Sequence, residues 1–249
     1  GIITGACDTQ EARLIARLGV PVIVCEPSPP MRQPTHPLAK FSCTNLNSYA
    51  CGKLAADYYL NRHYSQFAFV GDPCGLYWSK EREAGFRETV EKAGKTCHIY
   101  PQLSDAEKQD WAVEQPRLQA WLHALPKPTA LFAAMDGRGR QVLDACMGAD
   151  IAVPDQLAVL GVDNDELICE ATFPALSSVL TVGQQTGYLI AEHLERLMRG
   201  DRLKKRIFTS TPTHIVTRRS TDVAVIPDRH IALALQFIWN TAGHQPIHV

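Results

Sequence analysis

The stretch LAVLGVDNDELICEATFPALSSVL, residues 157–180, decides the fold class. Its first six residues, 157–162, form a short apolar run of the kind that a buried parallel strand needs. The run stops at Asp163-Asn164-Asp165-Glu166, where such a strand would end. In open α/β sheets, ligands bind in the crevice beyond the carboxyl ends of the strands. We therefore predict that these polar residues recognise something small and polar.

A solvated loop that leads into a helix N-cap is the alternative interpretation of the same residues. It suits Asn164 or Asp165, because short polar side chains are preferred at helix N-caps. It suits Asp163 less well, since that residue directly follows the strand. Asp163 is thus the best candidate in this stretch for contact with a ligand.

Composition places the chain among globular proteins. Its 249 residues are 45% apolar and 20% charged, enough for one domain or two lobes. The formal net charge of −1 gives no general attraction to nucleic acid. No apolar run reaches the length of a membrane span, and no secretory signal precedes Gly1. We expect a cytoplasmic protein that does not contact membranes.

Neither the cysteines nor the histidines form a metal-binding motif. The eight cysteines contain no C-x-x-C pair and are expected to be small buried hydrophobes in a reducing compartment. The nine histidines include no H-E-x-x-H arrangement, and Pro246 separates His244 from His248. The sequence therefore predicts no metal site, and it predicts no cofactor.

Strand-like apolar runs alternate with helix-like segments, which predicts βαβ units and a parallel sheet. We expect strands at 20–25, 67–70, 129–134, 157–162 and 207–216, and helices at 9–18, 48–60, 81–93, 139–147 and 182–199, with another ending near residue 125. The proline-rich residues 27–37 predict a surface loop. Residues 1–4 resemble the end of a strand. Residues 228–241 resemble an amphipathic helix, and no segment follows it against which it could pack. We expect both ends to lie inside domains.

Trp78 and Arg82 open the expected helix that follows the strand at 67–70. An arginine can direct its forked donors onto vicinal hydroxyls or a carboxylate. A tryptophan one helical turn earlier offers a flat apolar face of the kind that stacks on a sugar ring. A surface helix with Trp78 in the core explains the pattern equally well, so both interpretations stay open here.

Asp136 and Asn47 are weaker candidates for contact with a ligand. Asp136 follows the strand at 129–134 and would face the crevice, but a helix N-cap is a strong alternative. The adjacent Gly137-Arg138-Gly139 matches half of a dinucleotide fingerprint, and Val142 replaces its third glycine. Asn47 leads into the helix at 48–60, where an N-cap role for Asn47 or Ser48 is the simpler interpretation.

Catalysis finds little support in the sequence. It contains no G-x-S-x-G elbow, P-loop, kinase signature or zinc-hydrolase signature, and no general base paired with a nucleophile. The polar residues at the expected strand ends suit hydrogen-bonded capture of a polyol. We predict a binding protein, not an enzyme.

Five segments resemble, in order and spacing, the effector-binding domain of the LacI/GalR family, which is related to periplasmic sugar-binding proteins. They are FAFVG at 67–71, REAGF at 82–86, IAVPD at 151–155, LGVDN at 160–164 and PALSSV at 174–179. The resemblance implies an α/β fold of the periplasmic-binding-protein-like type I, with two doubly wound parallel-sheet lobes and an interlobe cleft. It also implies that about two strands and two helices of the first lobe precede Gly1.

Three segments, VDNDEL at 162–167, ALSSV at 175–179 and RRSTD at 218–222, resemble more closely the regulators that join a LacI-type sensor to an AraC-type DNA-binding domain. That resemblance implies an N-terminally truncated sugar-binding domain over 1–221, and a linker with the start of a truncated helix-turn-helix domain over 222–249. It implies a small sugar effector, a pentose such as xylose, and a homodimer. DNA would be bound through helix-turn-helix units that follow residue 249.

The family pattern also implies roles for individual residues. Arg82 and Asp163 would hold the effector, while Trp78 and Asp136 would line the cleft. Asn47 would also contact the effector, although Asn47-Ser48 replaces the usual Asp-Asn. The sequence departs from the family pattern at two further places. Met135 replaces a common asparagine, and Leu180-Thr181 stands where many relatives have glutamine or arginine. The identity of the sugar is therefore not determined.

Three hypotheses therefore follow. The chain is the sensory part of a sugar-responsive transcription regulator, a free sugar-binding protein of a transport system, or a nucleotide-dependent enzyme that uses residues 137–139. The second predicts an export signal and no DNA-binding extension. The first is favoured because residues 222–249 resemble the linker and first helix of an AraC-type unit. Neither the sugar nor the direction of regulation is fixed by the sequence.

Overall fold

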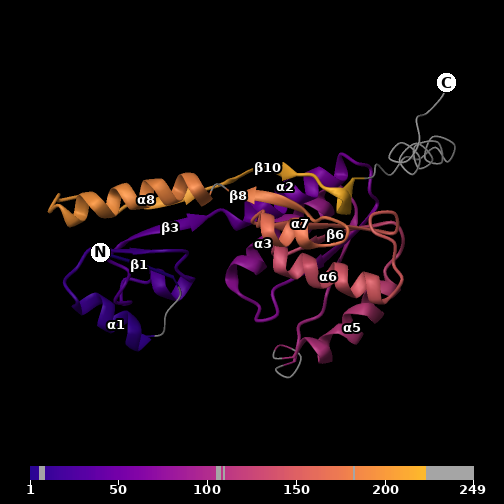
Figure 1. Ribbon diagram of the computed structural model, residues 1–249, viewed down its shortest axis with the longest axis horizontal. Coiled ribbons are helices and arrows are strands. Elements are labelled where there is room, and N and C mark those ends of the chain that lie inside the picture. The colour runs from indigo at the N-terminus through magenta and orange to yellow at the C-terminus, as the bar shows by residue number, and fades with distance from the viewer. Residues whose placement is uncertain (6–8, 105–107, 109, 182, 223–249) are drawn as a thin grey trace.

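The chain forms two α/β lobes, each built on its own sheet (Figure 1). This arrangement is seen in a computed structural model that describes residues 1–5, 9–104, 108, 110–181 and 183–222. Two doubly wound lobes with predominantly parallel sheets are the predicted fold class, which is confirmed. Within the described ranges, no helix is long and apolar enough to cross a membrane.

The first lobe has a four-stranded parallel sheet in the order β1-β2-β3-β9. Its elements are β1 (Ile2–Thr4), α1 (Thr9–Arg17), β2 (Val22–Val24), η1 (Pro29–Arg32), β3 (Ser42–Leu46), α8 (Gly183–Met198) and β9 (Ile207–Ser210). Strand β2 is buried at every position because α8 packs on it through Ile190, beside Ile23 and Phe208. The far side of β2 is covered by Ala12 of α1 and by Met31.

The second lobe has a six-stranded sheet in the order β10-β8-β7-β6-β4-β5, in which only β10 is antiparallel to its neighbour. Its strands are β4 (Gln66–Val70), β5 (Thr96–Ile99), β6 (Thr129–Ala133), β7 (Leu157–Val162), β8 (Ser177–Thr181) and β10 (Pro212–Val216). Its helices are α2 (Ser48–Leu60), α3 (Tyr77–Lys92), α5 (Trp111–Ala124), α6 (Asp136–Gly148) and α7 (Glu166–Ala171), and the turn η2 (Arg219–Thr221) follows β10.

Alternate residues of β4 explain how this sheet is covered on both faces. Phe67 and Phe69 point to the face covered by α2 and α3, where they join an aromatic cluster with Phe86 and Phe132. Ala68 and Val70 point to the opposite face, which α5 and α6 cover. Strand β7 lies between β6 and β8 and is buried at all six positions, as its continuous apolar run predicts.

Helices α2 and α3 pack so closely that only glycine fits where they meet. A Cβ atom on Gly85 would lie 2.0 Å from the backbone oxygen of Tyr49. A Cβ atom on Gly52 would lie 2.0 Å from the backbone oxygen of Arg82. This close approach fixes the position of the first two turns of α3, and therefore of Trp78 and Arg82.

The chain passes between the lobes three times: after Leu46, after Thr181 and after Ser210. The third passage divides a segment that was predicted as one strand. We predicted one strand over 207–216, but β9 belongs to the first sheet and β10 to the second. Pro212, which has no N–H to donate, stands at the junction.

Other predicted elements agree with the structure to within a few residues. Helix α2 and strand β7 have the predicted bounds, whereas α6 begins at Asp136 instead of residue 139. Strands β3, β5 and β8 were not predicted. The proline-rich loop is confirmed and contains only the short 3-10 turn η1. The predicted helix at 228–241 lies outside the described residues, and the domain division at 221 stays a prediction.

Candidate ligand-binding cavity between the lobes

A cavity of about 410 Å³ lies where the chain passes between the lobes. All three passages contribute to its wall, through Leu46 and Ser48, Thr181 and Gly183, and Ser210. The first lobe adds the two residues that follow β2 and residues of β3 and α8. The second lobe adds residues that follow β6 and β7 and the start of α3. Sites for small molecules typically measure roughly 300–1,000 Å³, so this cavity suits a small ligand.

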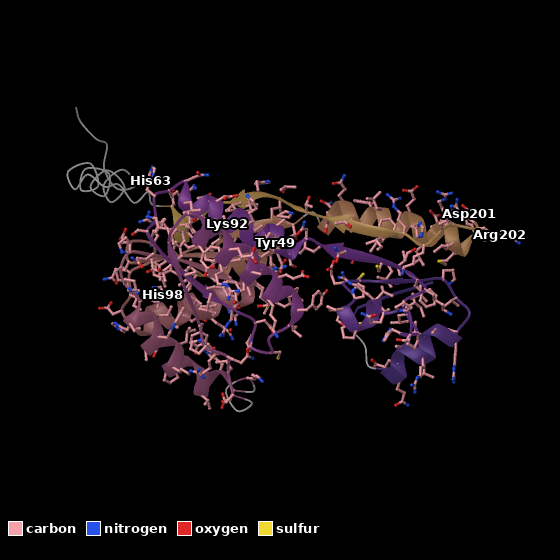
Figure 2. All side chains as sticks on the ribbon, turned by 180° about the vertical axis from the view of Figure 1, so that it is seen from behind. Tyr49, His63, Lys92, His98, Asp201 and Arg202 are labelled. Atoms are coloured by element: carbon pink, nitrogen blue, oxygen red, sulfur yellow. The ribbon has the colours of Figure 1, made fainter. Side chains whose placement is uncertain are left out.

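Figure 2 shows from behind which parts of the two lobes face each other. Tyr49, at the start of α2, lies on the side of the second lobe that faces the first lobe. Asp201 and Arg202 lie at the far end of the first lobe. The start of α2 is therefore near the junction that forms the cavity, and Ser48 contributes to its wall.

Arg82 is a buried cation in the wall of this cavity. Its side chain is 5% exposed and its Nη2 lies 3.2 Å from Asp163 Oδ1. Its Nη1 donates to the backbone oxygen of Ala134 at the end of β6. Its guanidinium carbon lies 4.9 Å from the ring centre of Trp78, close enough for a cation–π interaction. Only two of its five N–H donors are used in these hydrogen bonds.

Asp163 reaches the cavity through an unusual backbone turn at the end of β7. Its φ is +103° and that of Asn164 is +52°, values that non-glycine residues rarely adopt. The turn is held by β8, because the Asp163 N–H donates to the Val179 oxygen at 3.0 Å and the Asn164 N–H to Ser178 Oγ at 3.0 Å. The Asp163 side chain is 48% exposed. Such backbone strain is concentrated at functional sites.

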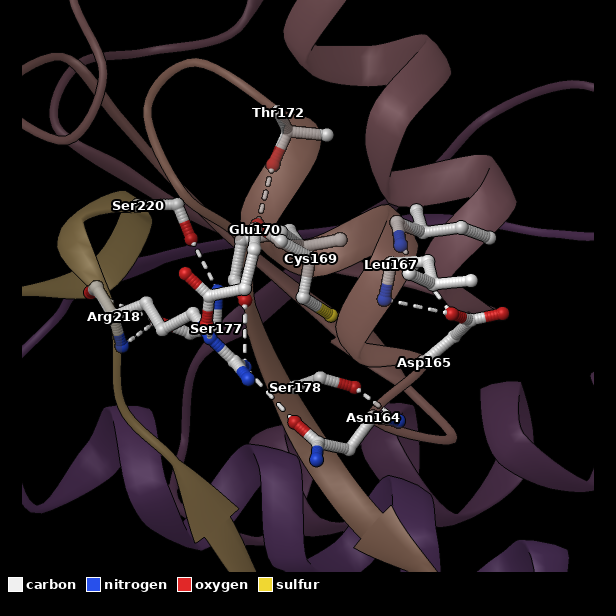
Figure 3. A network of polar contacts seen from close by, with 12 residues as sticks. Asn164, Asp165, Leu167, Cys169, Glu170, Thr172, Ser177, Ser178, Arg218 and Ser220 are labelled. Carbon is white, nitrogen blue, oxygen red and sulfur yellow. Dashed lines mark hydrogen bonds and ion pairs between the residues drawn. The ribbon is translucent and has the colours of Figure 1, made fainter.

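The residues after Asp163 have structural roles in a polar network (Figure 3). Asn164 Oδ1 accepts a hydrogen bond of 2.8 Å from Arg218. Asp165 caps α7, because its carboxylate accepts from the N–H groups of Leu167 and Ile168 at 3.0 and 3.3 Å. The capping interpretation is therefore confirmed for Asp165, and Asp163 alone of these three lines the cavity.

Asp136 is buried behind the cavity wall and is not one of the residues that line it. Its Oδ1 accepts from Ser178 Oγ at 2.6 Å, and its Oδ2 accepts from the Asp165 N–H at 2.8 Å. The N-cap position of α6 belongs to Met135. Asp136 thus joins the start of α6 to the turn that carries Asp163. Its contact with a ligand stays a prediction.

Burial raises the pKa of the Asp136 carboxyl from its ordinary 3.8 to about 6, although the bonds from Ser178 and Asp165 oppose this shift. Between pH 4 and 6 the folded protein therefore binds more protons here than the unfolded chain does. The free energy of unfolding should consequently fall as pH rises through this window and level off above it. Asp136→Asn should remove that fall, on the order of 2–3 kcal/mol at about 1.4 kcal/mol per pKa unit.

Urea unfolding of the parent and of Asp136→Asn at pH 4, 5, 6 and 7 measures this difference. Asparagine keeps the shape, and its amide can donate to Ser178 Oγ while its oxygen accepts from the Asp165 N–H. A difference between the two proteins that does not change from pH 4 to pH 7 would contradict the raised pKa.

Asn47 is the N-cap of α2, where its Oδ1 accepts from the Ala50 N–H at 3.0 Å. The simpler interpretation of this residue is thus confirmed. Asn47 does not line the cavity, whereas its neighbour Ser48 does. A ligand contact for Asn47 stays a prediction.

Arg138, in the Gly137-Arg138-Gly139 segment, is fully buried and forms an ion pair with Glu114 of α5. Its Nε also donates to the Gly71 oxygen at 3.1 Å. The arginine is therefore used inside the second lobe and is not available to a dinucleotide. Among the described residues, no group of three His, Cys, Asp or Glu residues could hold a metal ion.

Glu26, which was not predicted as a site residue, lines the cavity from the first lobe. Glu26 follows β2 closely, as Asp163 follows β7, so its position after a strand was the available signal. The prolines that follow it led us to assign this region to a surface loop, and Glu26 was not considered. Hydroxyl-bearing residues of the wall were also missed, namely Thr44, Ser48, Thr181, Thr186 and Ser210.

The buried thiol of Cys51 in α2 lies close enough to Arg82, Asp163 and Glu26 for their charges to influence its pKa. Burial is the main cause that raises its pKa to about 11. The charge of Arg82 lowers this pKa, while the charges of Asp163 and Glu26 raise it. All three groups therefore act on the same region, from both lobes.

Comparisons with known proteins agree with this arrangement. A family model described as periplasmic binding protein-like domain matches residues 56–221. The xylose operon regulatory protein of Escherichia coli K12 is 32% identical over 244 residues, which cover 97% of this chain and 61% of that protein. Its namesake in Haemophilus influenzae is 33% identical over 201 residues, which cover 80% of this chain and 52% of that protein. The chain thus matches only 52–61% of the length of these relatives.

Solved structures show the same likeness. One described as a xylose-binding transcription activator superposes with a TM-score of 0.80 at 30% identity, over 99% of this chain and 64% of that one. A periplasmic binding protein/LacI transcriptional regulator from Alkaliphilus metalliredigens, complexed with D-xylulofuranose, has a TM-score of 0.71. At 17% identity, over 90% of this chain and 78% of that one, this second likeness shows the fold alone.

Proposed function

This chain belongs to the periplasmic binding protein-like domain family, and from that membership we propose that it is the effector-binding region of a sugar-responsive transcription regulator. Its effector is a small sugar, and a pentose such as xylose fits best. The observation that carries this proposal is the pairing of Arg82 with Asp163 beside the ring of Trp78, all in the wall of one interlobe cavity.

This set of groups has the chemistry that captures a polyol. The free N–H donors of Arg82 and the half-exposed carboxylate of Asp163 can bind the oxygens and hydroxyls of a sugar. Trp78 offers an apolar ring face. The names of the two relatives above, which are regulatory proteins of a xylose operon, support the choice of a pentose.

Sugar binding would be relayed by a shift between conformational populations. A ligand that contacts both walls binds the closed form of the lobes better than the open form, and so favours closure. We propose residues 1–221 as the sensor and residues 222–249 as the linker and start of an AraC-type DNA-binding unit. The regulator would act in the cytoplasm as a homodimer and bind DNA through that unit.

Arg218 connects the sugar pocket to the segment that leaves the sensor. It follows β10, donates to Asn164 Oδ1 at 2.8 Å and to the Leu176 oxygen at 3.1 Å, and pairs with Glu170 at 2.5 Å (Figure 3). Its own N–H donates to Ser177 Oγ at 2.7 Å. Asn164 is next to Asp163 in the chain. A ligand-induced movement of Asp163 would therefore be passed to Arg218 through Asn164 alone.

Arg218→Ala should therefore weaken sugar binding by about three- to tenfold, because Asn164 loses the charged partner that holds its strained turn. The measurement is a calorimetric titration with D-xylose. Arg219→Ala is the matched control, since that neighbouring arginine is exposed. Equal affinities for the two variants would show that Arg218 does not support the turn.

Titration of this chain with a panel of ligands tests the proposed function. The panel holds D-xylose, L-arabinose, D-ribose, D-glucose and the oxidised nicotinamide dinucleotides. We expect saturable binding of one sugar molecule per chain, with a pentose preferred and no binding of the dinucleotides. Binding of a dinucleotide, or of no sugar at all, would overturn the proposal.

A further inference from the structure

Glu26 is held at the cavity wall by an unusual conformation at the end of β2. Its φ is +47°, in the left-handed region that favours glycine. The Glu26 N–H donates to Thr44 Oγ1 at 2.9 Å, and its backbone oxygen accepts from the Tyr77 hydroxyl at 3.0 Å. These contacts from β3 and α3 compensate for the strained conformation. The first lobe thus presents a fixed carboxylate to the cavity.

The carboxylate is oriented by donors of the same lobe but keeps capacity for a ligand. Thr44 Oγ1 donates to its Oε1 at 3.1 Å, and the Leu46 N–H is shared between its two oxygens at 2.9 and 3.0 Å. An ionised carboxylate can accept about four hydrogen bonds. With only two donors engaged, acceptor positions remain for hydroxyls of a bound molecule.

Glu26 also sets the charge of the cavity. The positive charge of Arg82 is paired with Asp163. Within the described part of the chain, no arginine, lysine or histidine forms an ion pair with Glu26. Of the described residues that line the cavity, Glu26 and Asp163 are acidic and Arg82 is basic, so the wall carries one carboxylate in excess. The charge of Glu26 also acts on Tyr77: burial and, next in size, this charge raise the pKa of the phenol, while Arg32 lowers it.

We propose that Glu26 is a specificity-determining residue, which accepts hydroxyl groups of a neutral sugar from the first-lobe side and excludes sugar acids and sugar phosphates. A neutral polyol brings donors to the free acceptor positions. An anionic ligand brings a like charge, and a second carboxylate or a phosphate at this wall meets repulsion in a partly desolvated site. The inference rests on the proposed function, because it concerns the ligand of the same cavity.

Separate calorimetric titrations with neutral sugars and with the corresponding sugar acids test this inference. The probes are D-xylose, L-arabinose and D-ribose, each beside the aldonic acid made from it. We expect the parent to bind its preferred pentose at least about a hundredfold more tightly than the matching acid. Glu26→Gln keeps an oxygen for Leu46 and Thr44 but loses the charge. We expect it to bind the pentose about tenfold more weakly and the acid more tightly than the parent does.

Glu91→Gln, at an exposed position near the end of α3, removes a carboxylate away from the cavity and should leave both affinities unchanged. A Glu26→Gln variant that keeps the parent's preference for pentose over acid would overturn the inference while leaving the proposed function intact. Should that variant fail to fold, the parent still decides: equal affinity for a pentose and its acid overturns the role of Glu26. A parent that binds none of the neutral sugars overturns the proposed function itself.

Discussion

Replacing Arg82 with alanine is expected to weaken sugar binding by roughly a hundred- to a thousandfold, about 3–4 kcal/mol. Hydrogen bonds to a charged group contribute roughly 1.5–3 kcal/mol each, and the guanidinium can make at least two of them to vicinal hydroxyls. The substitution also leaves Asp163 without the cation that lies 3.2 Å away. This is the largest loss of affinity that we expect from any single side chain of the cavity.

Calorimetric titration with D-xylose measures the effect, and two variants make it specific. Arg87→Ala is the matched control, because Arg87 lies on the same helix but pairs with Glu83 at the surface, 42% exposed. It should bind the sugar as the parent does. Arg82→Lys keeps the charge but not the forked donors, and should fall between the parent and Arg82→Ala. Parent-like affinity in a folded Arg82→Ala protein would exclude the guanidinium from the site.

Gly85→Ala is expected to lower the free energy of unfolding by about 4 kcal/mol, more than the roughly 1–3 kcal/mol usual for overpacking. The added methyl would lie 2.0 Å from the Tyr49 backbone oxygen and 2.9 Å from its carbonyl carbon. These obstacles are backbone atoms of α2, so no side-chain rotation relieves the clash. The helices must separate, and α3 then no longer holds Arg82 beside Ala134 and Asp163.

Chemical unfolding in urea measures this change, with Gly137→Ala as the matched control. Gly137 lies in the first turn of α6, and the nearest atom to its added Cβ is Met135 Cε at 3.6 Å, an ordinary contact. Because alanine favours the helix over glycine, this control should be about 0.5–1 kcal/mol more stable than the parent. Similar stabilities for the two variants would contradict the close packing of α2 and α3.

Some of the site could be predicted because its signals are local. The run at 157–162 is apolar at nearly every position, which a strand buried on both faces requires, and β7 has those bounds. The residue after such a strand reaches the sheet edge in most α/β folds, and Asp163 does line the cavity. For Trp78 and Arg82 the residues alone left two interpretations open, and the family resemblance placed them at the cleft; both lie in the cavity wall.

The remaining features depend on contacts between distant segments. Asp136 and Asp163 both follow strands and look alike in the sequence. In the fold, Asp136 lies so close to β7 that a Cβ on Gly161 would be 2.3 Å from its Oδ1, whereas the turn after β7 directs Asp163 into the cavity. The residues of β9 and β10 share one β-branched pattern, and only the pairing of β9 with β3 and of β10 with β8 separates them.

The most direct test of this account is a crystal structure of the chain grown with a saturating concentration of D-xylose. We predict one sugar molecule in the interlobe cavity, with its hydroxyls within hydrogen-bond distance of the Arg82 guanidinium and the Asp163 carboxylate, and the ring of Trp78 against it. Sugar bound elsewhere with this cavity empty, or sugar in the cavity without contact to Arg82 and Asp163, would contradict the account.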